Sequence, residues 1–210
     1  MSLNLKLFRF SKHFCIEDLI NKPLFEIIAI GGSAGSLPVL INILKVLPDN
    51  FSIPIVIVVH RLKNAFSEMD KILAVHFKQF RLCEPEDKTP IEKNHIYLAP
   101  QNYHLLVEED KTFSLDYSEL INYTRPSIDV SFNSISYVYH EKALAILLSG
   151  ANRDGAEGID NIILNGGTGI VQNPETAEYT AMPQSAINKN EHLKILYPQQ
   201  IIDYISSLHN

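Results

Sequence analysis

The stretch Phe25-Glu26-Ile27-Ile28-Ala29-Ile30-Gly31-Gly32-Ser33-Ala34-Gly35-Ser36 decides the fold of this chain. Its apolar run ends in small residues, and residues 37–44 then have helical character, so the stretch predicts a strand, a tight turn and a helix. Glycines on both sides of Ser33 allow the backbone to reverse closely. Two functions fit this turn. Gly31-x-Ser33-x-Gly35 matches a nucleophile elbow, and the same turn could cradle a phosphate.

Length, charge and cysteine content narrow the class of protein. The chain has 210 residues, so we expect residues 1–24 to be a peripheral extension and residues 25–210 to form one domain. A formal net charge of −6 argues against a partner that is nucleic acid. No apolar run approaches the roughly 18 residues of a membrane span. Only Cys15 and Cys83 occur, without metal-site or disulfide spacing, which is typical of a protein of the reducing cytoplasm.

The rest of the chain continues the pattern of alternating strands and helices. Residues 53–59 and 143–148 are continuous apolar runs, typical of strands buried on both faces of a parallel sheet. Further strands are predicted at 82–84, 95–99, 168–171 and 193–196, and helices at 66–80, 128–140, 156–164, 183–188 and 199–208. We therefore predict an α/β fold with a doubly wound, mostly parallel sheet flanked by helices. Strands at 104–107 and 113–115 predict an antiparallel hairpin at one edge, around Glu108 to Lys111.

Polar groups follow three of the predicted strands. Ser33 follows the first strand, His60 ends the second, and Asp154 lies in the Gly-rich turn after residues 143–148. Ligands of such sheets bind outside the carboxyl ends of the strands. A serine hydroxyl needs a base to become a nucleophile, and an imidazole serves best when a carboxylate fixes its tautomer. Each residue has a simpler interpretation, such as Asp154 as a helix N-cap, but the three together favour a catalytic triad.

The order Ser, His, Asp argues against an α/β-hydrolase, in which the acid precedes a late histidine. The late histidines here, His192 and His209, adjoin no turn motif.

Several segments together resemble the catalytic domain of CheB, the chemotaxis receptor methylesterase family. The resemblance runs from about Ile27 to Ile187 and rests on the order and spacing of its segments. These are residues 28–35, Val58-Val59-His60, Tyr97-Leu98-Ala99-Pro100, Arg125-Pro126-Ser127-Ile128-Asp129, residues 148–158, Gly166-Gly167, Val171-Gln172-Asn173 and residues 181–187.

The resemblance implies a protein-glutamate methylesterase with a Ser33-His60-Asp154 triad. Its substrate would be the γ-glutamyl methyl ester of a methyl-accepting chemotaxis receptor or a similar methylated protein, with glutamine deamidation as a related activity. The oxyanion would be held by backbone N–H groups near Ala34 and Ala151. No metal or organic cofactor is expected.

This chain also departs from the family pattern. Ala34 stands where a hydroxyl residue is usual, Ser36 replaces a glycine, and Ala151-Asn152-Arg153 replaces Met-Gly and a small or polar residue. The altered turn motivates an alternative, a catalytically weak module that binds receptor or signalling-protein helices. Arg153, and Arg125 before Pro126, are candidates for contacts with an acidic substrate helix. Residues 1–24 are too few for the receiver domain usual in the family, so we expect a catalytic domain without one.

Overall fold

The computed structural model describes residues 25–61 and 81–208. The predicted extension at 1–24 and the predicted helix at 66–80 lie outside the described residues. Seven strands form one parallel sheet in the order β3-β4-β2-β1-β7-β8-β9. Their bounds are β1 Ile27–Gly32, β2 Ile55–Val59, β3 Arg81–Cys83, β4 His95–Leu98, β7 Ala143–Leu147, β8 Thr168–Gln172 and β9 Lys194–Leu196. The doubly wound parallel sheet predicted from the sequence is confirmed.

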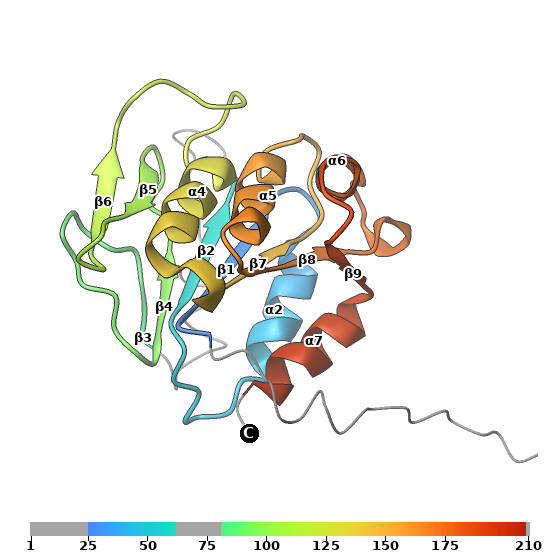
Figure 1. Cartoon of the computed structure of the whole chain (residues 1–210), viewed down its shortest axis with the longest axis horizontal. Coiled ribbons are helices and arrows are strands. Elements are labelled where there is room, and N and C mark those ends of the chain that lie inside the picture. Colours follow the sequence, from blue (N-terminus) through green and yellow to red (C-terminus); the bar gives the residue numbers. More distant parts are fainter. Residues whose placement is uncertain (1–24, 62–80, 209–210) are drawn as a thin grey trace, which may run out of the picture.

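Helices cover both faces of this sheet (Figure 1). One face carries α4 (Ile128–Tyr139), α5 (Ala156–Leu164) and α6 (Ala181–Lys189), and the other carries α2 (Leu37–Lys45) and α7 (Pro198–Ser207). Short 3₁₀ turns occupy His140–Lys142 and Pro174–Thr176. Helix α6 begins two residues before the predicted start at Pro183, and the other helix bounds lie within one residue of the prediction.

The central strand β1 shows why the sheet must be buried on both sides. Ile27 and Ala29 pack under α4 and α5, whereas Ile28 and Ile30 pack under α2 and α7. All four side chains are at most 1% exposed. Because successive side chains of a strand point to opposite faces, a continuous apolar run is the sequence that two helical layers require.

The predicted hairpin exists, but it forms a separate two-stranded sheet. Strands β5 (His104–Val107) and β6 (Phe113–Asp116) form this sheet in antiparallel register, and the backbone of Phe113 also bonds to Lys88 and Thr89 in the connection between β3 and β4. Leu105, Val107 and Phe113 are buried in the core that lies under α4. The hairpin is therefore held by burial of these side chains and by backbone bonds to residues 88–89, and not by pairing with a strand of the main sheet.

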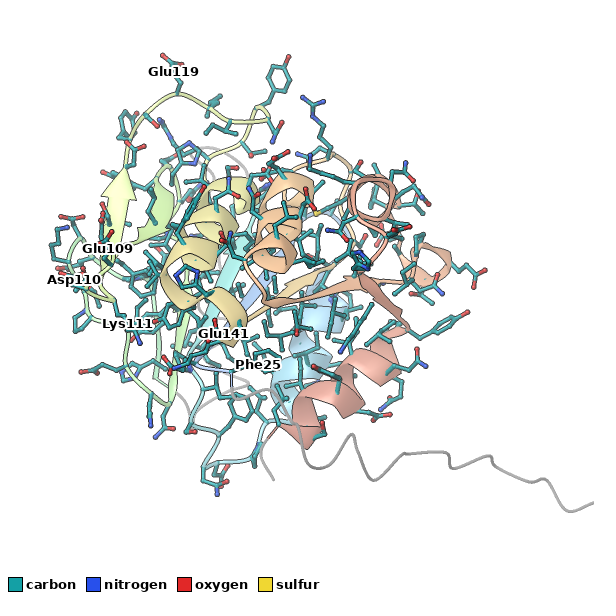
Figure 2. The ribbon with its side chains drawn as sticks, in the orientation of Figure 1. Phe25, Glu109, Asp110, Lys111, Glu119 and Glu141 are labelled. Carbon is teal, nitrogen blue, oxygen red and sulfur yellow. The ribbon has the colours of Figure 1, made fainter. Side chains whose placement is uncertain are left out.

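A loop at residues 117–125, part of the connection from β6 to α4, reaches the turn after β7, where Asn122 and Thr124 contact Asp154. Figure 2 shows Glu119 on this loop and Phe25 at the opposite end of the molecule, where β1 begins. Glu109, Asp110 and Lys111 mark the exposed turn of the hairpin. Among the helices of residues 25–61 and 81–208, none is long and apolar enough to cross a membrane.

Candidate active site

Three adjacent strands bring the predicted triad residues to one end of the sheet. β1 lies between β2 and β7, so the residues that follow these strands meet at the carboxyl edge. Gly32 of β1 is in register with Val59 of β2, and the N–H of His60 donates to the Gly32 carbonyl at 3.3 Å. Ser33 and His60 therefore occupy the next position along two neighbouring strands.

The turn at Ser33 is held on both sides by hydrogen bonds. The Ser33 N–H donates to the Ser149 carbonyl at 2.9 Å, and the Ser33 carbonyl accepts from the Ser36 hydroxyl at 2.6 Å. Gly35 has a φ of +76°, and a Cβ on it would lie 2.6 Å from Cβ of Glu178. The left-handed conformation and the close neighbour both require glycine at this position. The turn thus fixes the backbone of Ser33 and leaves its side chain half-buried at the rim.

Glycine is also needed at Gly31, immediately before the turn. A Cβ on Gly31 would lie 2.6 Å from Cγ2 of Ile128 and 3.1 Å from Cζ of Phe132. The missing side chain lets the first turns of α4 pack directly on the end of β1. This contact brings the amino end of α4 to the carboxyl edge of the sheet, beside the candidate triad.

His60 makes its contact with the carboxylate through Nε2. The Nε2 atom lies 2.7 Å from Oδ2 of Asp154, and the His60 side chain is 11% exposed. This pairing leaves Nδ1 as the nitrogen available to a nucleophile. Between the described residues Ser33 and His60, no side-chain hydrogen bond is formed. The hydrogen bond between a nucleophile and its general base is often long in the absence of substrate and tightens when substrate binds. The geometry therefore suits general-base catalysis by His60 Nδ1.

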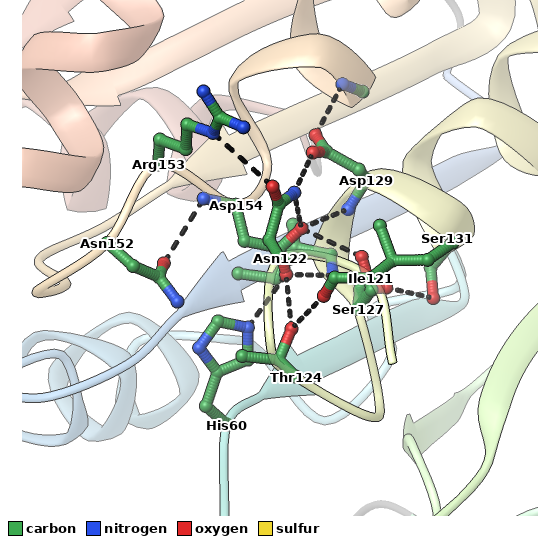
Figure 3. A network of polar contacts seen from close by, with 12 residues as sticks. His60, Ile121, Asn122, Thr124, Ser127, Asp129, Ser131, Asn152, Arg153 and Asp154 are labelled. Carbon is green, nitrogen blue, oxygen red and sulfur yellow. Dashed lines mark hydrogen bonds and ion pairs between the residues drawn. The ribbon is translucent and has the colours of Figure 1, made fainter. Parts of the chain in front are cut away.

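Asp154 is completely buried and surrounded by hydrogen-bond donors (Figure 3). Its Oδ1 and Oδ2 each accept from side chains and from the backbone at the amino end of α4. The donors to Oδ1 are Ser127 Oγ at 2.7 Å, Asp129 N at 3.2 Å and Asn122 Nδ2 at 3.2 Å; those to Oδ2 are His60 Nε2 and Ile128 N, both at 2.7 Å, and Thr124 Oγ1 at 3.3 Å.

These contacts keep Asp154 ionised although it is buried. Burial alone would raise the pKa of the Asp154 carboxyl, but hydrogen bonds from His60, Ile128 N and Ser127 hold it well below its usual range. Backbone N–H groups at a helix amino end favour an anion through the helix dipole. The N-cap of the helix that follows Asp154 is Gly155, so the predicted alternative role of Asp154 as that cap is wrong. It accepts instead from two N–H groups of α4.

A second buried carboxylate, Asp129, lies beside the first. Its Oδ1 accepts from Gly158 N at 2.8 Å and its Oδ2 from Asn122 Nδ2 at 2.9 Å. Burial, with the charge of Asp154 nearby, raises the pKa of Asp129 to about 6. Asn122 therefore donates to both carboxylates and links Asp129 to the His60–Asp154 pair.

The backbone N–H groups of Ala34 and Ala151 remain candidates for the oxyanion site. Both residues are exposed. Within residues 25–61 and 81–208, neither N–H donates to a protein acceptor. The neighbouring Asn152 does not have a positive φ, and its Oδ1 accepts from the Asp154 N–H at 3.1 Å. Asn152 thus fits this turn without a left-handed backbone and supports the segment that carries Asp154.

The two predicted substrate-binding arginines have different surroundings. The Arg125 guanidinium stacks 3.8 Å from the ring centroid of Tyr117, and its Nη1 donates to the carbonyls of Tyr117 and Ser118. Arg125 thereby closes the 117–125 loop. Arg153 is exposed, and its Nε donates to Asn122 Oδ1 at 3.4 Å without contacting the Asp154 carboxylate. Of the two, Arg153 is the more exposed.

Several residues of this site were missed in the sequence. Asn122, Thr124 and Ser127 all contact Asp154 from a loop that carries no periodic pattern. Ser127 was noted only as part of the segment from Arg125 to Asp129. Ser149, which donates to the Ala34 carbonyl at 2.8 Å, was noted only as part of the turn after residues 143–148. A serine before a predicted helix signals an N-cap, but Ser127 uses its hydroxyl for Asp154 and makes no cap bond. In the part of the chain described, no group of three or more His, Cys, Asp or Glu residues is placed to hold a metal.

Comparisons with known proteins agree with this arrangement. The sequence profile of the CheB methylesterase family matches residues 28–205. A Leptospira interrogans protein described as a protein-glutamate methylesterase/protein-glutamine glutaminase is 44% identical over 184 residues, which are 88% of this chain and 90% of that protein. A Thermotoga maritima protein-glutamate methylesterase/protein-glutamine glutaminase is 30% identical over 86% of this chain and 54% of its own length. This chain thus spans about half the length of the Thermotoga protein.

A solved structure has the same fold. The crystal structure of the Thermotoga maritima CheB methylesterase catalytic domain superimposes with a TM-score of 0.81 and 30% sequence identity. The match covers 88% of this chain and 98% of that domain.

Proposed function

Because this chain belongs to the CheB methylesterase family, we propose that it is a serine esterase that hydrolyses γ-glutamyl methyl esters on a chemoreceptor or a similarly methylated protein. The observation that carries the proposal is the hydrogen bond of 2.7 Å between His60 Nε2 and the buried Asp154, beside Ser33 on the adjoining strand. A neutral imidazole with one nitrogen bonded to a carboxylate presents the other as a base.

The acylation half of the reaction uses all three residues. Ser33 Oγ attacks the ester carbonyl while His60 Nδ1 accepts the hydroxyl proton, and Asp154 stabilises the imidazolium that forms. Backbone N–H groups of Ala34 and Ala151 bind the developing oxyanion, a contribution worth roughly 2.7–4 kcal/mol per donor in comparable enzymes. His60 then gives the proton to the departing methoxide, which leaves as methanol.

Deacylation repeats these roles with water. His60 removes a proton from a water molecule that attacks the acyl-enzyme, and it returns the proton to Ser33 Oγ as glutamate is released. A glutamine side chain can enter the same sequence and release ammonia in place of methanol, which accounts for deamidation as a second activity of this site. Each step uses only groups of the protein, the substrate and water.

Two competing functions are less well supported. The alternative of a catalytically weak module was motivated by the Ala151-Asn152-Arg153 turn, and the hydrogen bond of Asn152 to the Asp154 N–H favours an intact turn instead. A phosphate cradle at Gly31 to Gly35 needs free N–H groups, but the N–H of Ser33 already donates to Ser149. If the turn bound nucleotides, a nucleotide panel would raise the melting temperature of the protein, and we expect no change.

Covalent labelling gives the direct test of the esterase. A serine-directed fluorophosphonate should form one adduct on Ser33, located by peptide mass spectrometry. Labelling should be lost in Ser33→Ala and strongly slowed in His60→Ala, because the hydroxyl is a weak nucleophile without its base. Release of methanol from a methylated receptor fragment then tests the substrate. Absence of any adduct, in conditions that label the Thermotoga maritima relative, would refute the esterase and favour the binding module.

A further inference from the structure

The two buried carboxylates beside His60 are joined by one side-chain amide. Asn122 Nδ2 lies 2.9 Å from Asp129 Oδ2 and 3.2 Å from Asp154 Oδ1 (Figure 3). An amide nitrogen has two hydrogens, one for each carboxylate. The orientation of this amide is fixed by its neighbours, because the opposite one would turn Oδ1 toward two carboxylates and Nδ2 toward the Arg153 Nε donor.

Two adjacent carboxylates in a buried site tend to share one proton. Like charges disfavour double ionisation, and burial adds to this effect. Asp129 is 8% exposed and Asp154 is fully buried. In the part of the chain that the structure describes, Asp129 has no ion pair within 4 Å. Its ionised form is held by the N–H of Gly158 and by Asn122.

We propose that Asn122 is a positioning residue of the triad, whose amide keeps Asp129 and Asp154 ionised together so that Asp154 presents a full negative charge to His60. Without this amide, Asp129 holds a proton and donates it to Asp154. An acceptor that shares such a proton stabilises the imidazolium less. The inference rests on the proposed esterase, and it assigns to Asn122 a role that acts through Asp154 and not on the substrate.

The backbone around Asn122 suits this role. Asn122 and Tyr123 have φ values of 52° and 64°, and Ile121 and Thr124 form a bridge, so the segment is a tight turn of two left-handed residues. Asparagine adopts this conformation more readily than most residues. The Tyr123 side chain is 96% exposed, whereas the Asn122 side chain points inward to the carboxylates.

This geometry provides a matched pair of variants. Asn122→Gly removes the amide and keeps the left-handed turn without strain. Tyr123→Gly makes the same change at the next residue, whose side chain is outside the polar network. Asp129→Asn removes the second titrating carboxyl.

Other charged groups lie around Asp129, and the test must separate their effects from its titration. Asp154 and Lys189 interact electrostatically with Asp129 itself. The remaining groups contact its neighbours: His60 contacts Asp154, Arg153 contacts Asn122, His104 contacts Ser127 N, and Glu157 and Asp160 contact Lys189. All of them are unchanged in the Asn122→Gly variant and in Asn122→Gly/Asp129→Asn. If the midpoint of the pH profile shifts in Asn122→Gly but not in the double variant, the shift is caused by titration of Asp129.

The experiment measures kcat/KM for hydrolysis of a methylated receptor fragment between pH 5.5 and 8.5. Loss of one hydrogen bond to a charged group displaces a titration by about one pH unit. The acid-side midpoint of Asn122→Gly should therefore lie about one unit above that of the unaltered protein, with activity reduced roughly tenfold below the midpoint. Tyr123→Gly should leave the midpoint in place, and Asn122→Gly/Asp129→Asn should lack the displacement.

Two results would overturn the role of Asn122: an unchanged midpoint in Asn122→Gly, or a displacement that persists in the double variant. A second measurement needs no turnover. Carboxyl ¹³C NMR should show Asp129 titrating about one pH unit higher in Asn122→Gly than in the unaltered protein. If the unaltered protein hydrolyses no ester, the proposed function fails, and the NMR titration still decides whether Asn122 keeps the two carboxylates ionised.

Discussion

Replacement of Asp129 by asparagine should change how the stability of the fold depends on pH. Asp129 is buried, and its pKa is raised to about 6, about two units above the ordinary value of an aspartate. Each unit corresponds to 1.36 kcal/mol, so ionisation of Asp129 lowers the free energy of unfolding by about 3 kcal/mol in total.

The sign of the effect follows from proton binding. Between about pH 4 and pH 6 the folded chain keeps a proton on Asp129 that the unfolded chain has released. The free energy of unfolding therefore falls as the pH rises through this range, and the loss is complete above about pH 7. Asp129→Asn lacks this titration, so it should gain stability relative to the unaltered protein by about 2 kcal/mol between pH 4.5 and 7.5.

Urea denaturation followed by circular dichroism at several pH values measures this difference. The substitution also changes the hydrogen bonds of residue 129 with Gly158 and Asn122, which alters the free energy of unfolding at every pH. The quantity to compare is therefore the change of this free-energy difference with pH. Asp110→Asn is the control, because Asp110 is exposed and the Thr112 hydroxyl lowers its pKa. Because its pKa is lowered, Asp110 titrates below pH 4.5. The stability of Asp110→Asn relative to the unaltered protein should therefore not rise between pH 4.5 and 7.5. A difference for Asp129→Asn that stays constant, or falls as the pH rises, would contradict the assignment of a raised pKa.

Three further predictions concern the triad and its support. Asp154→Asn should reduce turnover of the methyl ester by about 10⁴-fold, as loss of tautomer control does in other triads, and urea denaturation should show a stability lower by about 1–3 kcal/mol because buried donors lose a carboxylate. Gly35→Ala should lower the rate of fluorophosphonate labelling at Ser33, since a Cβ at a φ of +76° would meet Glu178; an unchanged rate would show that the turn tolerates the side chain. Phe132→Ala should destabilise the fold by about 3–5 kcal/mol, measured by urea denaturation, and a loss below 1 kcal/mol would mean that the core collapses to fill the space.

The sequence pattern predicted the parts of the fold that depend on burial over whole segments. β1, β2 and β7 are continuous apolar runs because helices cover both faces of the sheet, and the segment that follows each run carries a polar residue of the site. The hairpin was predicted from its turn, but its separation from the sheet was not. That separation depends on Phe113 and Leu105 packing under α4, a contact between distant segments that short-range patterns do not contain.

In the candidate site, too, the sequence pattern did not predict contacts between distant segments. Ser33, His60 and Asp154 were predictable because each follows a strand whose carboxyl end must lie at one edge. Asn122 and Ser127 were not, because they reach Asp154 from a loop whose position in space depends on the left-handed turn and on Arg125. The tendency of asparagine to adopt positive φ was the one local signal.

The contact between Asp154 and the amino end of α4 has a consequence for sequence classification. The Asp154 carboxylate accepts from two of the open N–H groups at the amino end of α4, so it stabilises the fold in addition to its proposed role in hydrolysis. Among the described residues, the Ser33 hydroxyl forms no side-chain hydrogen bond, so the fold does not depend on this hydroxyl. A descendant of this architecture that abandoned hydrolysis would be free to lose the serine hydroxyl, whereas selection for a folded chain would retain the aspartate. Conservation of the aspartate is therefore a poor marker of activity among relatives, and the serine is the informative position.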